Sequence, residues 1–197
     1  NPTPKYVEGS LQALDNAFLW AKKYGVKIII DLHAAPGSQN GWEHGSSRDG
    51  SQEWGKTDEN IQQTVDIIEF LTARYAKNPS LYAVELINEP RAPGASQESL
   101  NKYYKAGYEA VRKHSNAYVV LSNRLGPADP REFLSLASEW VAEWNVKGAT
   151  KEEYQKFAEA QLDVYGRATF GWAYWTLKNV NNPWSLEWMI KNGYIKL

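Results

Sequence analysis

Apolar side chains recur at spacings of three and four residues in several stretches of the chain, which is the period of an amphipathic helix. Leu11, Leu14, Phe18 and Ala21 set this spacing in the first stretch, which Gly25 ends. The same period predicts helices over residues 10–24, 58–75, 100–114 and 151–165.

Short, β-branched and mostly apolar runs alternate with these helices. They predict strands over residues 26–32, 81–87, 117–121 and 169–176. An apolar run without polar alternation is typical of a strand covered on both faces, as in a parallel sheet between helices. The alternation of strands and helices therefore predicts an α/β fold built from βαβ units in one domain.

The composition narrows the class of partner. The chain has 197 residues, of which 43% are hydrophobic and 23% charged, and its net charge is −1. Proteins that bind nucleic acids or membrane surfaces normally have an excess of Lys and Arg over Asp and Glu, so both are disfavoured as partners. The apolar runs are too short to span a bilayer. The chain has no cysteine, so thiolate metal sites are excluded. Aromatic residues reach 13%, which favours a flat or apolar ligand face.

Chemistry in parallel α/β folds gathers where the strands end, because the loops converge at that edge of the sheet. Acids, a histidine, amides and indoles occupy those positions here, namely Asp31, His33, Asn88, Glu89, Asn123, Trp172, Tyr174 and Trp175. This set suits a sugar, since carboxyl groups can donate protons or attack, histidine and asparagine bind hydroxyls, and indole faces stack on a pyranose.

Three separated motifs carry a resemblance to a known family. The run Val-Glu-Leu-Ile-Asn-Glu-Pro at residues 84–90 resembles the acid/base strand of family 5 glycoside hydrolases. Residues 31–41 and 172–179 are similar to the matching loop and last strand of the exo-β-1,3-glucanase branch, and residues 143–148 are most like its plant members.

The resemblance implies a retaining β-glucosidase on a (β/α)₈ barrel, acting on a β-glucan or β-glucoside without a cofactor. It makes Glu89 the general acid/base and aligns Glu139 with the family's nucleophile. A retaining site holds its two carboxyl groups about 5–5.5 Å apart. The substrate-binding residues that we predict are His33, Asn40, Trp42, Asn88 and Trp175.

The chain also departs from the family pattern. A complete barrel takes about 250 residues, so we expect a single partial barrel over residues 1–197, with about four or five parallel strands. The family's first two strands and a later strand with a His-x-Tyr pair have no match, which places an expected deletion junction near Ser138 and Glu139. Around that junction, apolar residues at helical spacing over residues 130–146 favour a helix, on which Glu139 would be an exposed glutamate rather than a nucleophile.

Structural alternatives stand beside the other assignments. Glu89 could be a structural carboxylate, and His33 a hydrogen-bonded core residue. We interpret His44 as a loop residue, and no spacing of histidines or carboxylates supports a metal site. Trp42 and Trp54 lie in a long polar loop, where sugar stacking and loop packing are equally compatible with the sequence.

Three hypotheses for function follow. The first is the glycosidase, whose intact parent would be extracellular or in the cell wall, as is general among the plant relatives. The second is a catalytically inactive sugar-binding remnant, and the third is a truncated product with no function of its own. We expect a monomer whose exposed sheet edges favour aggregation.

Overall fold

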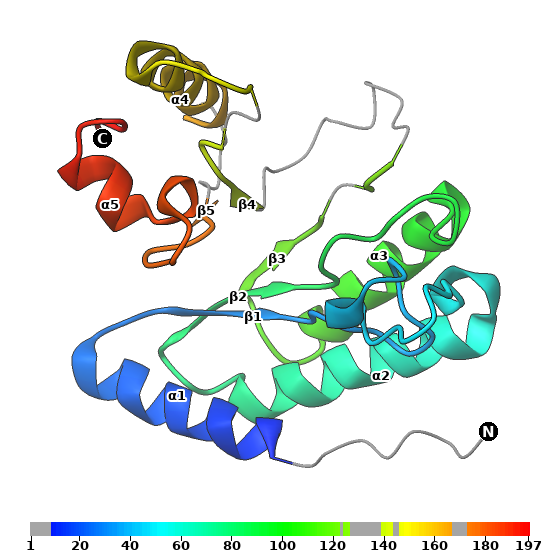
Figure 1. The fold of residues 1–197 in the computed structure, drawn as a ribbon. Coiled ribbons are helices and arrows are strands. Elements are labelled where there is room, and N and C mark those ends of the chain that lie inside the picture. Colours follow the sequence, from blue (N-terminus) through cyan, green and yellow to red (C-terminus); the bar gives the residue numbers. More distant parts are fainter. Residues whose placement is uncertain (1–8, 123, 127–138, 144–145, 167–172) are drawn as a thin grey trace. The chain divides into compact units, whose positions relative to one another are not determined.

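A computed structural model shows helices and parallel strands arranged in two compact units, residues 1–128 and 129–197 (Figure 1). The structure describes residues 9–122, 124–126, 139–143, 146–166 and 173–197. The single domain expected over the whole chain stays a prediction, and Ser138 of the expected junction lies outside the described residues.

The first unit alternates helices with strands. Its elements are α1 (Ser10–Tyr24), β1 (Ile28–Asp31), α2 (Asp58–Tyr75), β2 (Leu81–Glu85), α3 (Gln97–Arg112) and β3 (Tyr118–Val120). Two single-turn 3-10 helices, Glu43–Gly45 and Trp54–Lys56, interrupt the loop between β1 and α2. The predicted helices over residues 10–24 and 58–75 are confirmed to the residue.

Side-chain caps set where the helices begin. The Thr57 hydroxyl accepts from the backbone N–H of Asn60 at the start of α2, and Ser96 accepts from Ser99 at the start of α3. Gly25 ends α1 with a φ of 70°, a left-handed conformation that glycine adopts at little cost.

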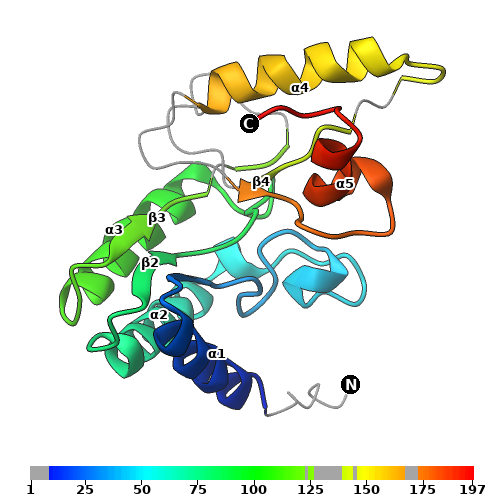
Figure 2. The ribbon, with the colours of Figure 1, turned by 90° about the vertical axis from the view of Figure 1, so that its left-hand side faces the viewer.

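The three strands form one parallel sheet in the order β1-β2-β3. Ile30 pairs with Val84, and Val84 pairs with Val119, so the strands end side by side. Helices α2 and α3 lie next to each other along this sheet (Figure 2). Parallel strands joined through helical crossovers confirm the α/β class, with a partial barrel as expected.

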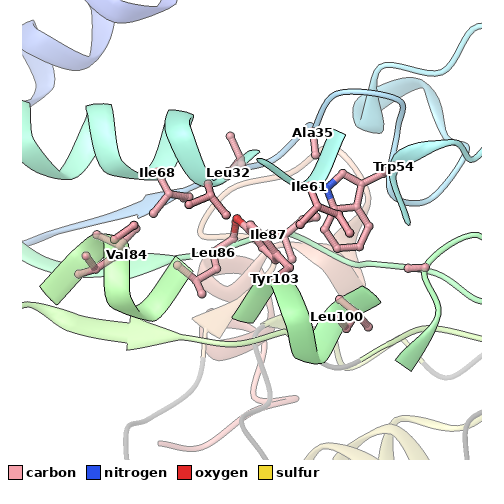
Figure 3. Close-up of a cluster of buried hydrophobic side chains, with 14 residues drawn as sticks. Leu32, Ala35, Trp54, Ile61, Ile68, Val84, Leu86, Ile87, Leu100 and Tyr103 are labelled. Atoms are coloured by element: carbon pink, nitrogen blue, oxygen red, sulfur yellow. The ribbon is translucent and has the colours of Figure 1, made fainter. Parts of the chain in front are cut away.

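The main core lies between this sheet and the two helices (Figure 3). Trp54 is fully buried in it, with its indole N–H donating to the Thr64 hydroxyl at 2.9 Å. Its ring packs edge to face against the Tyr103 ring, with the two ring centroids 5.3 Å apart, and the Tyr103 hydroxyl donates to the carbonyl of Leu86. The long loop is therefore fastened to the core, and packing explains Trp54 without a ligand.

The opposite face of the sheet differs from the expectation. Ile29 is 47% exposed and Tyr118 is 55% exposed, and both align with Ala83 in the strand register. Ala83 itself is fully buried, so the prediction that the apolar strands are covered on both faces is wrong at Ile29 and Tyr118, on the two outer strands. The helices α2 and α3 supply cover only to the face that carries Ile30 and Val84.

The second unit contains β4 (Glu139–Trp140), α4 (Lys151–Tyr165), β5 (Ala173–Tyr174) and α5 (Leu186–Lys191). The two short strands pair in parallel. A smaller core gathers Ala142, Ala158, Met189 and Ile195. The Tyr174 hydroxyl accepts from the N–H of Ala142 at 3.1 Å and donates to the carbonyl of Pro183 at 2.5 Å. These contacts hold β4 and the segment after β5 against one core.

The helix expected over residues 130–146 is wrong where the structure describes that segment. Glu139 and Trp140 form β4, with Glu139 opposite Ala173 and Trp140 opposite Tyr174. Residues 130–138 and 144–145 of that prediction lie outside the described residues. Backbone pairing with a distant strand overrides a local helical period, which the spacing of apolar residues alone does not reveal.

Candidate active site

The first candidate residues follow β1 and β2, whose ends stay paired beyond the strands themselves. Asp31 pairs with Glu85 at the last position of the sheet. Past that pair, the N–H of Asn88 donates to the carbonyl of Leu32 at 3.0 Å. The βαβ unit formed by β1, α2 and β2 therefore brings His33 and Asn88 to one edge of the sheet, although their positions in the sequence differ by 55.

A buried glutamine fastens these two segments together. Gln39 is fully buried, and its side-chain N–H₂ donates to the carbonyl of His33 at 2.9 Å and to that of Asn88 at 2.8 Å. Its carbonyl oxygen accepts from the N–H of Ala35 at 3.1 Å. All three partners are backbone groups, so Gln39 holds the backbone after β1 next to the backbone after β2.

A line of polar side chains runs from Asp31 through His33 to Asn88. The Oδ2 atom of Asp31 lies 2.6 Å from Nδ1 of His33, and Nε2 of the same ring lies 3.5 Å from Nδ2 of Asn88. Burial raises the pKa of Asp31, and the neighbouring Glu89 carboxylate adds to the rise, while the hydrogen bond from His33 lowers it. Asn88 is 3% exposed.

Glu89 has a strained backbone conformation. Its φ is 44°, in the left-handed region that non-glycine residues rarely adopt. Such strain costs on the order of 1–3 kcal/mol and persists where the surrounding structure enforces it, which is commonly at active sites. The turn aims the Glu89 carboxyl group at His44, with Oε2 lying 3.3 Å from Nε2 of that ring.

Sequence reasoning interpreted His44 as a loop residue and gave it no role in the site; it is an exposed loop residue, and it contacts Glu89. It lies in the 3-10 helix Glu43–Gly45, and its Nε2 atom is 3.3 Å from Nδ2 of the fully buried Asn40. The oxygen of the Asn40 amide accepts from the N–H of Trp42 at 3.0 Å, which fixes the orientation of that amide. The ring centroids of His33 and His44 are 5.5 Å apart. Asn40 is therefore a support for the site wall.

An open pocket of about 630 Å³ lies beside Glu89. Its wall includes the exposed Trp42, with the Arg91 guanidinium 5.1 Å from the ring centroid. The other lining residues are Gly41, Glu43, His44, Ser47, Arg48 and Gly50. A pocket of this size with an indole on its wall and a carboxyl group in it has room for a sugar ring.

The remaining candidates belong to the second unit. Glu139 is the first residue of β4, and its side chain is outside what the structure describes. Trp175 directly follows β5, is 43% exposed, and is joined to Thr176 by a cis peptide bond. Glu139 begins this two-residue pairing opposite Ala173, and Trp175 follows its other end, after Tyr174. Trp172 and Asn123 lie outside the described residues.

The structure thus groups the predicted residues in two sets. His33, Asn40, Trp42, Asn88 and Glu89 come together in the first unit, and Glu139 and Trp175 in the second. Asp31 was recognised as an acid at a strand end but was not assigned to the site. The Asp-x-His spacing was a usable signal for it, since residues two apart along an extended chain share one face.

Comparison with known proteins decides the family. Residues 1–126 match the family model for cellulase, glycosyl hydrolase family 5. The chain belongs to this family. It is 32% identical over 165 residues to a glucan 1,3-beta-glucosidase of Yarrowia lipolytica, covering 82% of this chain and 38% of that relative. It is 43% identical over 114 residues to a probable glucan 1,3-beta-glucosidase A of Aspergillus fumigatus, covering 57% of this chain and 27% of that relative.

These relatives agree with the family and branch named by the sequence motifs. The chain spans less than two fifths of the length of either relative. Among solved structures, a rutinosidase from Aspergillus niger aligns with a TM-score of 0.68 and 17% identity, covering 98% of this chain and 74% of that one. That likeness is one of fold.

Within the described residues, no group of three or more metal-binding side chains comes together. In the same part of the chain, none of the helices has the length and apolar character needed to cross a membrane.

Proposed function

We propose that this chain carries the site of a retaining glycosidase of the glucan β-glucosidase type, with Glu89 as its general acid/base. The observation that carries the proposal is the strained turn at Glu89, which directs a carboxyl group toward a pocket walled by Trp42. Family membership and relatives named as glucan 1,3-beta-glucosidases support it.

The reaction would proceed by double displacement. Glu89 gives its proton to the glycosidic oxygen while the Glu139 carboxylate attacks the anomeric carbon, so that the bond from that carbon to the leaving oxygen breaks. The glucosyl group is then held on Glu139. In the second step the Glu89 carboxylate takes a proton from water as the water oxygen attacks the same carbon and Glu139 leaves. This role for Glu139 requires its carboxyl oxygens to lie about 5–5.5 Å from those of Glu89.

The other residues would hold the sugar. Asn88 presents a buried amide next to Glu89 and suits the hydroxyl adjacent to the anomeric carbon. His33 suits a neighbouring hydroxyl, and Trp42 and Trp175 are exposed enough to stack on a pyranose face.

A sugar-binding function without bond cleavage is the second candidate. One observation favours it: His33, Asn88 and the Trp42 indole all belong to the first unit, whereas the proposed nucleophile belongs to the second. The first set could bind a glucosyl unit whether or not Glu139 reaches the anomeric carbon.

Hydrolysis of an aryl β-glucoside separates these functions. We expect turnover by the chain to be low, and we expect it to be lost in both Glu89→Gln and Glu139→Gln, with Glu187→Gln on α5 as a matched control that leaves it unchanged. A 2-deoxy-2-fluoroglucoside with an activated leaving group should label Glu139, located by peptide mass spectrometry. Binding of laminaribiose in calorimetry without hydrolysis or labelling would support the second function. Absence of binding, turnover and labelling would overturn the glycosidase proposal.

A further inference from the structure

Asp31 is a partly buried acid beside the site that the proposed reaction does not use. Its side chain is 30% exposed, and its closest polar partner is the ring of His33, at 2.6 Å. Burying a carboxylate is costly unless it is hydrogen-bonded. The position of Asp31 therefore suggests a task that needs a fixed acceptor.

The contact with Asp31 determines which ring nitrogen of His33 carries the proton. A carboxylate oxygen only accepts hydrogen bonds, so the contact with Asp31 requires the proton on Nδ1. In a neutral ring this leaves Nε2 with a free lone pair. The state of one ring nitrogen is set by the partner of the other, as it is where a carboxylate orients a histidine in metal and catalytic sites.

The second step is the orientation of the Asn88 amide. Nε2 of His33 faces Nδ2 of Asn88 at 3.5 Å, and an acceptor opposite an N–H₂ group is a matched pair. With Nδ2 turned toward the ring, Oδ1 of Asn88 is left as the acceptor for another group. Gln39 holds the carbonyls of both His33 and Asn88, so the backbone at either end of this contact is fixed.

We propose that Asp31 is a positioning residue that fixes the Nδ1–H tautomer of His33 and, through Nε2, turns the Asn88 amide so that Oδ1 accepts a hydrogen bond from a sugar hydroxyl. The last step rests on the proposed function. The first two steps concern the protein alone and stand apart from it.

The test uses long-range ¹H–¹⁵N spectra of the histidine rings at neutral pH, which distinguish the two tautomers. The His33 signals are identified by their loss in His33→Phe. We expect the Nδ1–H tautomer in the unaltered chain and a change toward the Nε2–H tautomer in Asp31→Ala. Asp31→Leu is a second variant that removes the carboxylate without opening a cavity, and Asp66→Ala, an exposed aspartate of α2, is the matched control.

An Nε2–H signal for His33 in the unaltered chain would overturn the proposal without any variant. Retention of the Nδ1–H tautomer in a folded Asp31 variant would overturn it as well. For the sugar, we expect laminaribiose affinity to fall about three- to tenfold in the Asp31 variants, the value of one hydrogen bond. A changed tautomer with unchanged affinity would overturn the last step. If the unaltered chain binds no sugar, the proposed function fails while the tautomers still decide the role of Asp31.

Discussion

The buried amide of Gln39 offers a sharp test of how the site is held together. Gln39→Glu changes the side chain by one atom and keeps its shape. The oxygen that accepts from Ala35 remains, but the N–H₂ that donates to the carbonyls of His33 and Asn88 becomes an oxygen. Two carbonyl oxygens, at 2.9 and 2.8 Å from the original nitrogen, would then face a third oxygen with no proton between them.

The cost follows from the two lost hydrogen bonds. Each carbonyl oxygen left without its donor costs about 1–3 kcal/mol, so we expect a loss of about 2–6 kcal/mol in the free energy of unfolding. The loss should depend on pH. A protonated carboxyl group can donate one bond, so folding raises the pKa of the new side chain above its unfolded value of about 4.3. The variant keeps more of its stability below that value and loses it as pH rises through the folded pKa.

Urea unfolding followed by tryptophan fluorescence at pH 4.5 and pH 7.5 measures this directly. We expect the difference in free energy of unfolding between Gln39→Glu and the unaltered chain to be larger at pH 7.5 than at pH 4.5. Gln12→Glu, on the exposed surface of α1, is the matched control and should stay within about 0.5 kcal/mol. If the free energy of unfolding of Gln39→Glu at pH 7.5 lay within about 1 kcal/mol of the value for the unaltered chain, Gln39 would not fasten the two segments together.

Three further predictions concern other parts of the first unit. Trp54→Ala should lower the free energy of unfolding by about 3–5 kcal/mol because it empties a fully buried site. Trp42→Ala should change the free energy of unfolding by less than about 1 kcal/mol and should weaken laminaribiose binding. Urea unfolding and calorimetry would contradict these assignments if Trp42→Ala lost the stability and Trp54→Ala lost the binding. Glu89→Gly should be more stable than Glu89→Ala by about 1 kcal/mol, because glycine relieves the positive φ, and an Ala variant of equal or greater stability would show that the turn is not strained. Hydrogen bonds from Arg74 and Tyr75 lower the pKa of Asp15 to about 2, so the stabilisation they give is present above pH 4 and is lost as pH falls toward 2. Asp15→Asn should therefore reduce the fall in melting temperature between pH 4 and pH 2, and an unchanged fall would argue against the pairing.

Local pattern was enough to predict much of the fold. The helices α1, α2 and α4 cover the residues that the three- and four-residue spacing indicates, because each buries one apolar stripe. The strands over residues 81–87 and 117–121 are recognisable because apolar, β-branched runs are too short for helices. Helix α3 begins three residues before the predicted start, where Ser96 caps it.

The misses have a common physical origin in contacts between distant residues. Glu139 lies on a strand because β5 pairs with it, although its own neighbours have a helical period. His44 is two residues from Trp42 in a polar loop, and only the folding of that loop onto Asn40 and Glu89 gives it a role. Trp54 could be assigned to the core only once its partner Thr64 was known.

The most direct test of the carbohydrate site is a titration of the chain with laminaribiose, followed through the NMR signals of the His33 ring, the Asn88 side-chain amide and the Trp42 indole. A glycosidase site at the ends of β1 and β2 predicts saturable shifts of all three signals with one shared dissociation constant, while the buried Trp54 indole stays unmoved. Signals of His33, Asn88 and Trp42 that do not respond at sugar concentrations well above the millimolar range would contradict it.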